Sequence, residues 1–274
     1  MMRRFWADFT ARDFAALDRG SLVAVLPVGA TEQHGPHLPF SVDRAILDGI
    51  IAATVPLIPE SVPALFLPTI PLGKSNEHGA WPGTLTLSAR TLIAVLMEIG
   101  DCVAAAGVRK LVILNSHGGQ VAPLDIVARD LRVRHRMMTV AAGWFAQGMP
   151  EGLFSERELR FGIHAGDMET SVMLALHGDL VRMDRARDFR SAVEDIEGEC
   201  LHLGLSPAGK LGWMMQDLNA DGACGNAAAA TPEKGRAVVE HAARQLVSLL
   251  EEVHGMSLSL LGNGAGRSGR DAAG

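Results

Sequence analysis

The chain has 274 residues, 48% of them hydrophobic and 20% charged, and its formal net charge is −6. This apolar content excludes global disorder, and the acidic balance argues against a nucleic-acid partner, which requires a basic face. No apolar stretch approaches the ~20 residues that span a bilayer, and the three widely spaced cysteines suit a reducing compartment. We therefore expect a soluble, cytoplasmic protein with no nucleic-acid and no membrane partner.

Strand-like and helical segments alternate along the chain, which predicts an α/β fold with a mostly parallel central sheet. The expected buried strands cover 21–29, 110–115 and 137–143, and the expected helices cover 44–55, 88–106, 121–134, 169–177 and 231–254. The run 64–72 has a strand composition, but Pro68 and Pro71 lack amide donors, so we expect an edge, a bulge or a loop there. Cys102 falls in an apolar helical run and is expected to be buried.

The second half of the chain contains a long stretch that the sequence describes poorly. Residues 182–226 have weak periodicity and many turn-forming residues, so no firm element is predicted there, but we expect the wall of the substrate pocket to include the region after residue 182. The chain after Met256 is rich in Gly and Ser and is expected to be disordered. The sequence thus predicts a single domain over 1–255, followed by a tail over 256–274.

The segment after the first predicted strand is rich in metal-ligand side chains. It reads EQHGPHLP from Glu32 onward, and Asp43 follows it. Because side chains two apart in an extended chain point the same way, Glu32 and His34 can converge on one point. Loops at the carboxyl ends of parallel strands form the usual ligand crevice of such a sheet. A Glu, a His and an Asp suit Zn²⁺, Mn²⁺ or Fe²⁺. Alternatively, the carboxylates of this loop could cap the helix that begins at Arg44.

Two further segments place a histidine or an acid at the end of a predicted element. The sequence NSHGGQ puts His117 just past a buried strand, where Gly118 and Gly119 allow close approach of a ligand. The sequence HAGDMETS puts His164 in a loop and Glu169 in the first turn of a helix, both facing the mouth of the expected crevice. Taken alone, His117 could be a structural histidine, and Glu169 could be an acid that stabilises the helix dipole.

A fourth segment, GKSNEHGAWPGT from Gly73 onward, mixes donors, acceptors, a large aromatic ring and three glycines. This composition is suited to holding a small polar substrate, and the candidate contacts are Ser75, Glu77, His78 and Trp81. Ser75 is a candidate hydrogen-bond donor to the substrate, whereas Glu77 and His78 could instead orient the metal ligands. An ordered Gly/Pro loop without a ligand would have the same composition.

Taken together, the four segments resemble the creatininase family of metal-dependent amidohydrolases, over about residues 20–250. The resemblance implies a three-layer α/β/α fold, a site for two divalent metal ions and a homo-oligomer, often a hexamer. It also implies the ligands: Glu32 and His117 hold one metal, His34 holds the other, and Asp43 bridges them.

Two glycines of this chain depart from the pattern of creatininase itself. Creatininase has a metal-binding Glu at the position of Gly119, which cannot bind a metal through a side chain. We therefore infer that Glu169 supplies the fifth ligand, as expected for the branches of the family that have His-Gly-Gly here. Creatininase also has a Tyr of its substrate pocket at the position of Gly118. These departures argue against creatinine as the substrate.

The reaction that the resemblance implies is hydrolysis of a cyclic or linear C–N amide bond in a small molecule. Two cations about 3.5–4 Å apart lower the pKa of a bridging water from 15.7 toward about 7 and polarise the amide carbonyl. The candidate catalytic residues are His164, which would deliver a proton to the leaving nitrogen, and Glu169. The alternatives are a peptidase or deformylase of the same family, such as the mycofactocin-maturation type, and a metal-binding oligomer without catalysis.

Overall fold

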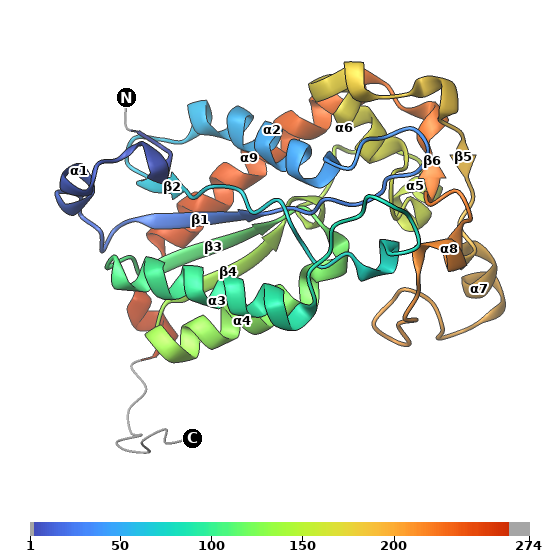
Figure 1. The fold of residues 1–274 in the computed structure, drawn as a ribbon. Helices are drawn as coiled ribbons and strands as arrows, with labels where there is room; N and C mark the ends of the chain where they lie inside the picture. The colour runs from blue at the N-terminus through green and yellow to red at the C-terminus, as the bar shows by residue number, and fades with distance from the viewer. Residues whose placement is uncertain (1–2, 263–274) are drawn as a thin grey trace.

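The computed structural model describes residues 3–262, and at its centre lies a four-stranded sheet (Figure 1). The sheet has the order β2-β1-β3-β4, and all neighbouring strands are parallel. Its strands are β1 (Val23–Val28), β2 (Ala64–Phe66), β3 (Lys110–Asn115) and β4 (Met138–Gly143). Every residue of β1, β2 and β3 is buried, as in strands that are covered on both faces.

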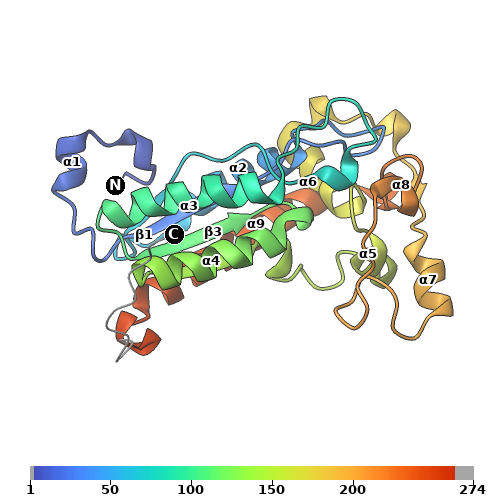
Figure 2. The same cartoon turned by 60° about the horizontal axis from the view of Figure 1, so that its bottom comes forward.

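Helices cover both faces of the sheet. One face carries α2 (Val42–Thr54), α6 (Asp167–His177) and α9 (Pro232–Gly255), whereas α3 (Ala89–Ala105) and α4 (Val121–His135) lie on the other face (Figures 1 and 2). The core divides in the same way, because alternate residues of β1 belong to two separate apolar clusters. This arrangement confirms the predicted three-layer α/β/α fold.

The remaining elements are short, and most of them lie beyond the carboxyl ends of the strands (Figure 1). The helices are α1 (Ala11–Ala15), α5 (Glu156–Phe161), α7 (Val193–Glu199) and α8 (Met215–Leu218), and β5 (Asp188–Phe189) pairs with β6 (Gly225–Asn226) in an antiparallel ribbon. The 3₁₀ helices cover Trp6–Asp8, Val55–Leu57, Asn76–His78, Gly118–Gln120, Trp144–Ala146, Gly178–Leu180, Met183–Arg185, Ala227–Ala229 and Leu258–Leu261.

The predicted ends of the main helices agree with the observed caps. The Ser88 hydroxyl accepts a hydrogen bond from the first turn of α3, and Gly107 follows that helix with a left-handed φ of 87°. The Thr231 hydroxyl caps α9 in the same way. The strand β2 ends at Phe66, before Pro68 and Pro71, and it forms an edge of the sheet as predicted.

Three expectations need correction or extension. Cys102 is exposed, so its predicted burial was wrong: α3 buries one face only, and Cys102 lies on the other. Residues Leu258–Leu261 form a helical turn, so the expected disorder does not begin at 256, and residues 263–274 of the tail lie outside the described residues. The stretch 182–226, for which no element was predicted, contains β5, α7, α8 and β6.

The order of the strands determines where a ligand can enter the sheet. The chain leaves β1 toward β2 on one side and leaves β3 toward β4 on the other, although β1 and β3 are neighbours. The loops after these two strands therefore separate and open a crevice at their carboxyl ends. The metal-ligand segments predicted from the sequence follow these two strands.

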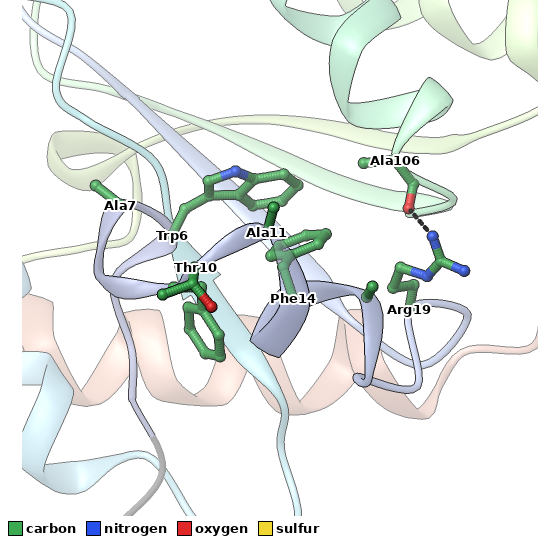
Figure 3. Close-up of a pocket in the computed structure, with 9 residues that line it drawn as sticks. Trp6, Ala7, Thr10, Ala11, Phe14, Arg19 and Ala106 are labelled. Atoms are coloured by element: carbon green, nitrogen blue, oxygen red, sulfur yellow. Dashed lines mark hydrogen bonds between the residues drawn. The ribbon is translucent and has the colours of Figure 1, made fainter.

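A different cavity, of about 470 Å³, lies between the amino-terminal segment and the end of α3 (Figure 3). The rings of Trp6 and Phe14 are 4.4 Å apart, and the Arg19 guanidinium donates to the carbonyl of Ala106 (Figure 3). Among the described residues that line this cavity there is no carboxylate, histidine or cysteine.

No helix in residues 3–262 is both long and apolar enough to cross a membrane.

Candidate metal centre

The five side chains predicted as metal ligands meet at the carboxyl edge of the sheet. Glu32, Asp43 and His117 offer ligand atoms that lie within 4.8 Å of one another, and so do His34, Asp43 and Glu169. Asp43 belongs to both sets, as expected of a carboxylate shared between two cations. Folding thus brings together residues that are up to 137 positions apart (169 − 32).

Each predicted ligand is held by the element that carries it. Glu32 and His34 follow β1, Asp43 lies in the first turn of α2, and Glu169 lies in the first turn of α6. His117 follows β3, where the Asn115 side chain fixes its backbone: the amide oxygen accepts from the His117 N–H at 3.0 Å, and the amide nitrogen donates to the His117 carbonyl at 2.8 Å.

Hydrogen bonds from the outer ring nitrogens determine the tautomers of both imidazoles. His34 Nδ1 donates to the Glu32 carbonyl at 3.0 Å, so Nε2 carries the lone pair, 3.9 Å from Asp43 Oδ1. His117 Nε2 donates to the Lys74 carbonyl at 2.9 Å, so Nδ1 carries the lone pair, 3.2 Å from Glu32 Oε1. Each imidazole therefore points an unprotonated nitrogen at a carboxylate oxygen, the orientation that second-layer hydrogen bonds give to metal-binding histidines.

These donors fit a divalent cation. Ligand atoms at 2.0–2.2 Å from a tetrahedral ion are about 3.4 Å apart, and the nitrogen–oxygen distances here are 3.2 to 3.9 Å. Within the described part of the chain, both Glu32 oxygens, His34 Nε2 and Asp43 Oδ2 are buried without a hydrogen-bond partner. Mixed imidazole and carboxylate ligands suit Zn²⁺, Mn²⁺ or Fe²⁺.

The charges in the cluster also require a positive partner. Burial raises the pKa of Asp43 well above its usual range, the neighbouring Glu32 adds to this, and burial likewise raises the pKa of Glu169. Burial opposes charge on Glu32 as well, but the positive charge that His117 carries when Nδ1 is also protonated outweighs it and lowers the pKa of Glu32. Glu32 in turn raises the pKa of His117 against the effect of burial. A proton on His117 or a bound cation can balance these carboxylates.

Glu169 serves the helix and the cluster together. One of its oxygens, Oε2, accepts a hydrogen bond from the Ala165 N–H at 2.5 Å, just before α6. Ala165 holds this amide in place with a left-handed φ of 56°, which is uncommon for a residue other than glycine. The acid thus satisfies a free amide at the helix start and also offers an oxygen near His34 and Asp43.

The space above Gly119 is filled by Glu77. A Cβ built on Gly119 would overlap Glu77 Oε1, so this position has no room for a carboxylate side chain. Glu77 Oε1 lies 3.4 Å from His117 Nε2, and Oε2 lies 3.2 Å from Lys74 Nζ. Burial opposes ionisation, but the hydrogen bond with His117 lowers the pKa of Glu77 to about 2. Glu77 is therefore an ionised group behind His117 that orients its ring.

His78 supports Glu32 from the other side. The Gln33 amide is oriented by two backbone contacts, since its nitrogen donates to the Gly222 carbonyl at 2.9 Å and its oxygen accepts from the Gly35 N–H at 2.9 Å. The same nitrogen lies 2.7 Å from His78 Nδ1, which must therefore accept. The protonated Nε2 of His78 then faces Glu32 Oε1 at 3.3 Å, so His78 positions the carboxylate and has no free lone pair for a metal.

His164 borders the cluster and lines the adjoining cavity. Its Nε2 donates to the Gln33 carbonyl at 2.7 Å, so the unprotonated Nδ1 faces Glu32 Oε1 at 3.8 Å. Its ring centre is 4.2 Å from that of His34, and Glu32, His34 and His164 form a third set of potential ligands. The Nδ1 atom is thus available to accept a proton or to bind a cation.

A cavity of about 490 Å³ opens onto this cluster. The predicted residues Glu77, His78, His117 and His164 line it. Ser75 is fully buried with Oγ 3.4 Å from His117 Nε2, and it is not among the lining residues. Trp81 packs instead against an apolar cluster of α7 and α8. The opposite wall comes from the stretch 182–226, with Leu205, Lys210, Leu211, Gly212 and Trp213, and no motif in the sequence indicated it.

Comparison with known proteins agrees with this geometry. The family model "Creatininase: Creatinine amidohydrolase" matches residues 7–250. The chain belongs to the creatininase family. A mycofactocin precursor peptide peptidase of Mycobacterium tuberculosis is 32% identical over 242 residues, which are 85% of this chain and 87% of that protein. Creatinine amidohydrolase of Pseudomonas putida is 33% identical over 199 residues, 67% of this chain and 74% of that enzyme.

Solved structures of the creatininase family share the whole fold. A protein of Bacteroides fragilis NCTC 9343, described as a candidate creatinine amidohydrolase, superposes with a TM-score of 0.77 and 28% identity and covers 94% of this chain and 99% of its own. A manganese structure of creatininase and a Zn–Zn structure of a mutant creatininase have TM-scores of 0.70 and 0.71 at 25% identity, and each covers 93% of this chain and 100% of its own. As a creatininase-family member, the chain is a hydrolase that acts on C–N bonds.

Proposed function

We propose that the protein hydrolyses a small-molecule amide at two divalent cations held by Glu32, His34, Asp43, His117 and Glu169. The observation that carries this proposal is the pair of ligand sets that share Asp43. The cluster adjoins a cavity of about 490 Å³, within the usual range for small-molecule sites. A non-catalytic metal site would not need a histidine such as His164, which lines that cavity beside the ligands.

The roles of the chain's own groups follow from their contacts. The cations, when bound, supply Lewis-acid polarisation of the amide carbonyl and lower the pKa of water. Glu32, Asp43 and Glu169 supply three negative charges that balance most of the cationic charge. Glu77 and His78 hold His117 and Glu32 in place. His164 is anchored through Nε2 and has Nδ1 free, so it can accept a proton from water and pass it to the leaving nitrogen.

The pocket favours a substrate other than creatinine. No described atom lies within 4 Å of a Cβ built on Gly118, where creatininase has a tyrosine, so the cavity is open there. A linear amide, including a short peptide, is therefore the second candidate substrate class. The similarity to mycofactocin precursor peptide peptidases over 85% of the chain supports this candidate.

Three further properties belong to the same proposal. We infer Zn²⁺, Mn²⁺ or Fe²⁺ as the metal, from the mixed ligands and from the zinc and manganese forms of creatininase. We infer the cytoplasm as the compartment, because Cys102, Cys200 and Cys224 are all unpaired. We infer a homo-oligomer of up to six chains from family membership, which light scattering of the purified protein tests directly.

The test of the function is a reconstitution experiment. Metal-depleted protein is loaded with Zn²⁺, Mn²⁺ or Fe²⁺, its metal content is measured, and a panel of lactams, imidazolidinones, formamides and short peptides is assayed with each metal. We expect two ions per chain and hydrolysis of at least one amide class, abolished by chelation. Two bound ions without hydrolysis of any amide would favour the non-catalytic alternative, and failure to bind divalent metal would refute the site.

A further inference from the structure

The outer wall of the cavity, opposite the metal cluster, is a loop whose backbone is held in place by hydrogen bonds within the loop. The Leu211 N–H donates to the Gly204 carbonyl at 2.8 Å, and the Gly204 N–H donates to the Gly209 carbonyl at 3.1 Å. The Leu205 N–H donates to Glu197 Oε1 at 3.3 Å, which ties the loop to α7. The backbone on both sides of Lys210 is therefore fixed, and its side chain projects from a stable wall of the cavity.

Lys210 is the lysine whose ammonium group has no partner among the described residues. The chain has four lysines. Lys74 pairs with Glu77, Lys234 pairs with Asp167, and Lys110 donates to the His254 carbonyl. Lys210 makes no ion pair or hydrogen bond with any residue in 3–262, although it lines the cavity that opens onto the metal cluster. A free ammonium group in that place can bind an anionic group of a ligand.

An apolar surface lines the same cavity as Lys210 and His164. Ile163, Leu205 and Trp213 all line the cavity, and all three belong to the half-buried rim of one apolar cluster. Ile163 directly precedes His164, the group that we assign to the leaving nitrogen. The apolar surface therefore lies on the side of the cavity that receives the amine half of the substrate.

We propose that the substrate is an amide whose amine half is an apolar amino acid with a free carboxylate. The carboxylate pairs with Lys210, and the apolar side chain lies against Ile163, Leu205 and Trp213. A single free ammonium matches a monoanion; a phosphate would gain one cation and would also face Asp125, which lines the same cavity. This substrate class rests on the proposed function.

The reaction is balanced without any other reactant. One water adds to the amide carbonyl carbon, the C–N bond breaks, and the products are a carboxylic acid and the free amino acid. The nitrogen takes up the proton that His164 carries. The substrate can be an N-acyl amino acid or the carboxyl-terminal residue of a peptide, since both present the same carboxylate and apolar side chain.

The experiment compares substrates that differ only in the carboxylate. N-acetyl-leucine and N-isopentylacetamide have the same amide and the same branched chain, and N-acetyl-glycyl-leucine represents a peptide end. Values of kcat and KM are measured for the metal-loaded wild type and for Lys210→Gln, Lys210→Arg and Asp125→Asn, at low and high salt. Metal content is measured for every variant, because a changed metal site would change all substrates together.

We expect the wild type to prefer N-acetyl-leucine over N-isopentylacetamide by about tenfold or more in kcat/KM, mainly through KM, since only the charged substrate can form a charge-assisted contact with Lys210. Lys210→Gln and high salt remove most of this preference, Lys210→Arg keeps it, and Asp125→Asn keeps or increases it. The ratio of N-acetyl-leucine to N-acetyl-glycyl-leucine tells whether N-acyl amino acids or peptide ends are preferred.

Three results would overturn the proposal. Equal kcat/KM for the charged and neutral amides would refute carboxylate recognition and leave the amidohydrolase function intact. A preference that survives Lys210→Gln would place the carboxylate elsewhere, for example on the metal ions. If the metal-loaded protein hydrolysed no amide in this set or in the wider panel, the proposed function would fall, and this substrate class with it.

Discussion

The two walls of the central cavity are built in opposite ways. The inner wall is formed by buried histidines, such as His117 at 4% exposure and its neighbour His164, and the fully buried Glu32 and His34 lie directly against these rings. The outer wall comes from one continuous segment, 205–213, whose Lys210 is exposed. The inner wall is fixed by the sheet and by hydrogen bonds to ring nitrogens, whereas the outer wall is braced mainly by its own backbone and by α7.

This structural difference matches a difference in function between the two walls. A reaction centre tolerates little displacement of its ligands, and the edge of a packed parallel sheet provides that rigidity. Substrate selection needs a surface that can vary without disturbing the sheet, and a surface loop provides it. Substitutions on the inner wall should therefore change metal content and kcat, whereas substitutions on the outer wall should change KM.

The largest effect is expected for Asp43→Ala. It removes the only one of the five proposed ligands that belongs to both ligand sets, so both ions should be lost and turnover should fall by at least about a thousandfold. Elemental analysis of the purified protein measures the metal content, and amide hydrolysis measures the activity. Asp48→Asn is the matched control, because Asp48 lies on the same helix but pairs with Arg44 at the surface. A variant at Asp43 that still holds two ions would refute the shared-ligand assignment.

The next effect in size is expected for His164→Gln. His164 forms a potential ligand set with Glu32 and His34, but it also lines the cavity with Nδ1 free. If it transfers protons, the variant should keep its metal and lose about a hundredfold to ten-thousandfold in kcat. Metal titration followed by single-turnover kinetics separates binding from chemistry. Loss of one ion in this variant would make His164 a ligand and remove it from proton transfer.

A smaller effect should distinguish two adjacent glycines. A Cβ on Gly119 would overlap Glu77 Oε1 and approach His117 Nε2, whereas a Cβ on Gly118 would meet no described atom within 4 Å. Gly119→Ala should therefore displace Glu77, weaken metal binding by about tenfold to a hundredfold and cost about 1–3 kcal/mol of stability. Gly118→Ala should leave the melting temperature and metal affinity unchanged. Calorimetry of metal binding and thermal unfolding checks both, and equal behaviour of the two variants would contradict the assigned role of Glu77.

The inner wall was largely predictable from the sequence. Glu32 and His34 follow a continuous apolar strand, and His117 follows another, so both segments had to open at the same edge of the sheet. What could not be predicted is which partner each ring would have. The contact of Glu77 with His117 spans 40 positions along the chain (117 − 77), and its geometry depends on the folded loop.

The region after residue 182 was expected to contribute to the wall of the pocket, and it does, but the residues that form this outer wall were not predictable, for a physical reason. Its residues have no periodicity, because the loop is held by backbone hydrogen bonds around Gly204 and Gly209, and backbone groups are the same for every residue type. The wrong prediction for Cys102 has its own physical reason. An apolar run shows that a helix forms, but it does not show which face of the helix the sheet covers. Ser75 and Trp81 were predicted as substrate contacts, but Ser75 is fully buried and Trp81 packs against an apolar cluster, so neither side chain lines the cavity.

One histidine joins the loop after β1 to α6 and to the start of the stretch 182–226. His37 follows the β1 loop, and its Nε2 lies 2.9 Å from the Thr170 hydroxyl of α6. Its ring stacks on Phe189 of β5 at 5.4 Å, and its carbonyl accepts from the Arg182 N–H at 2.8 Å. Burial lowers the pKa of His37 to about 4, so this joint contains a neutral imidazole in the folded protein at neutral pH.

The smallest expected effect is a pH dependence of stability, which comes from the buried ring of His37. In the unfolded chain His37 takes up a proton below about pH 6.5, but in the folded chain only below about pH 4, so stability falls as the pH drops through this interval. Between pH 7 and pH 5 the loss from this residue should be about 2 kcal/mol, and it should be absent in His37→Asn. Urea unfolding of both proteins at the two pH values measures it, with the exposed His202→Asn as a control. The same pH dependence in His37→Asn and the wild type would show that His37 is not its source.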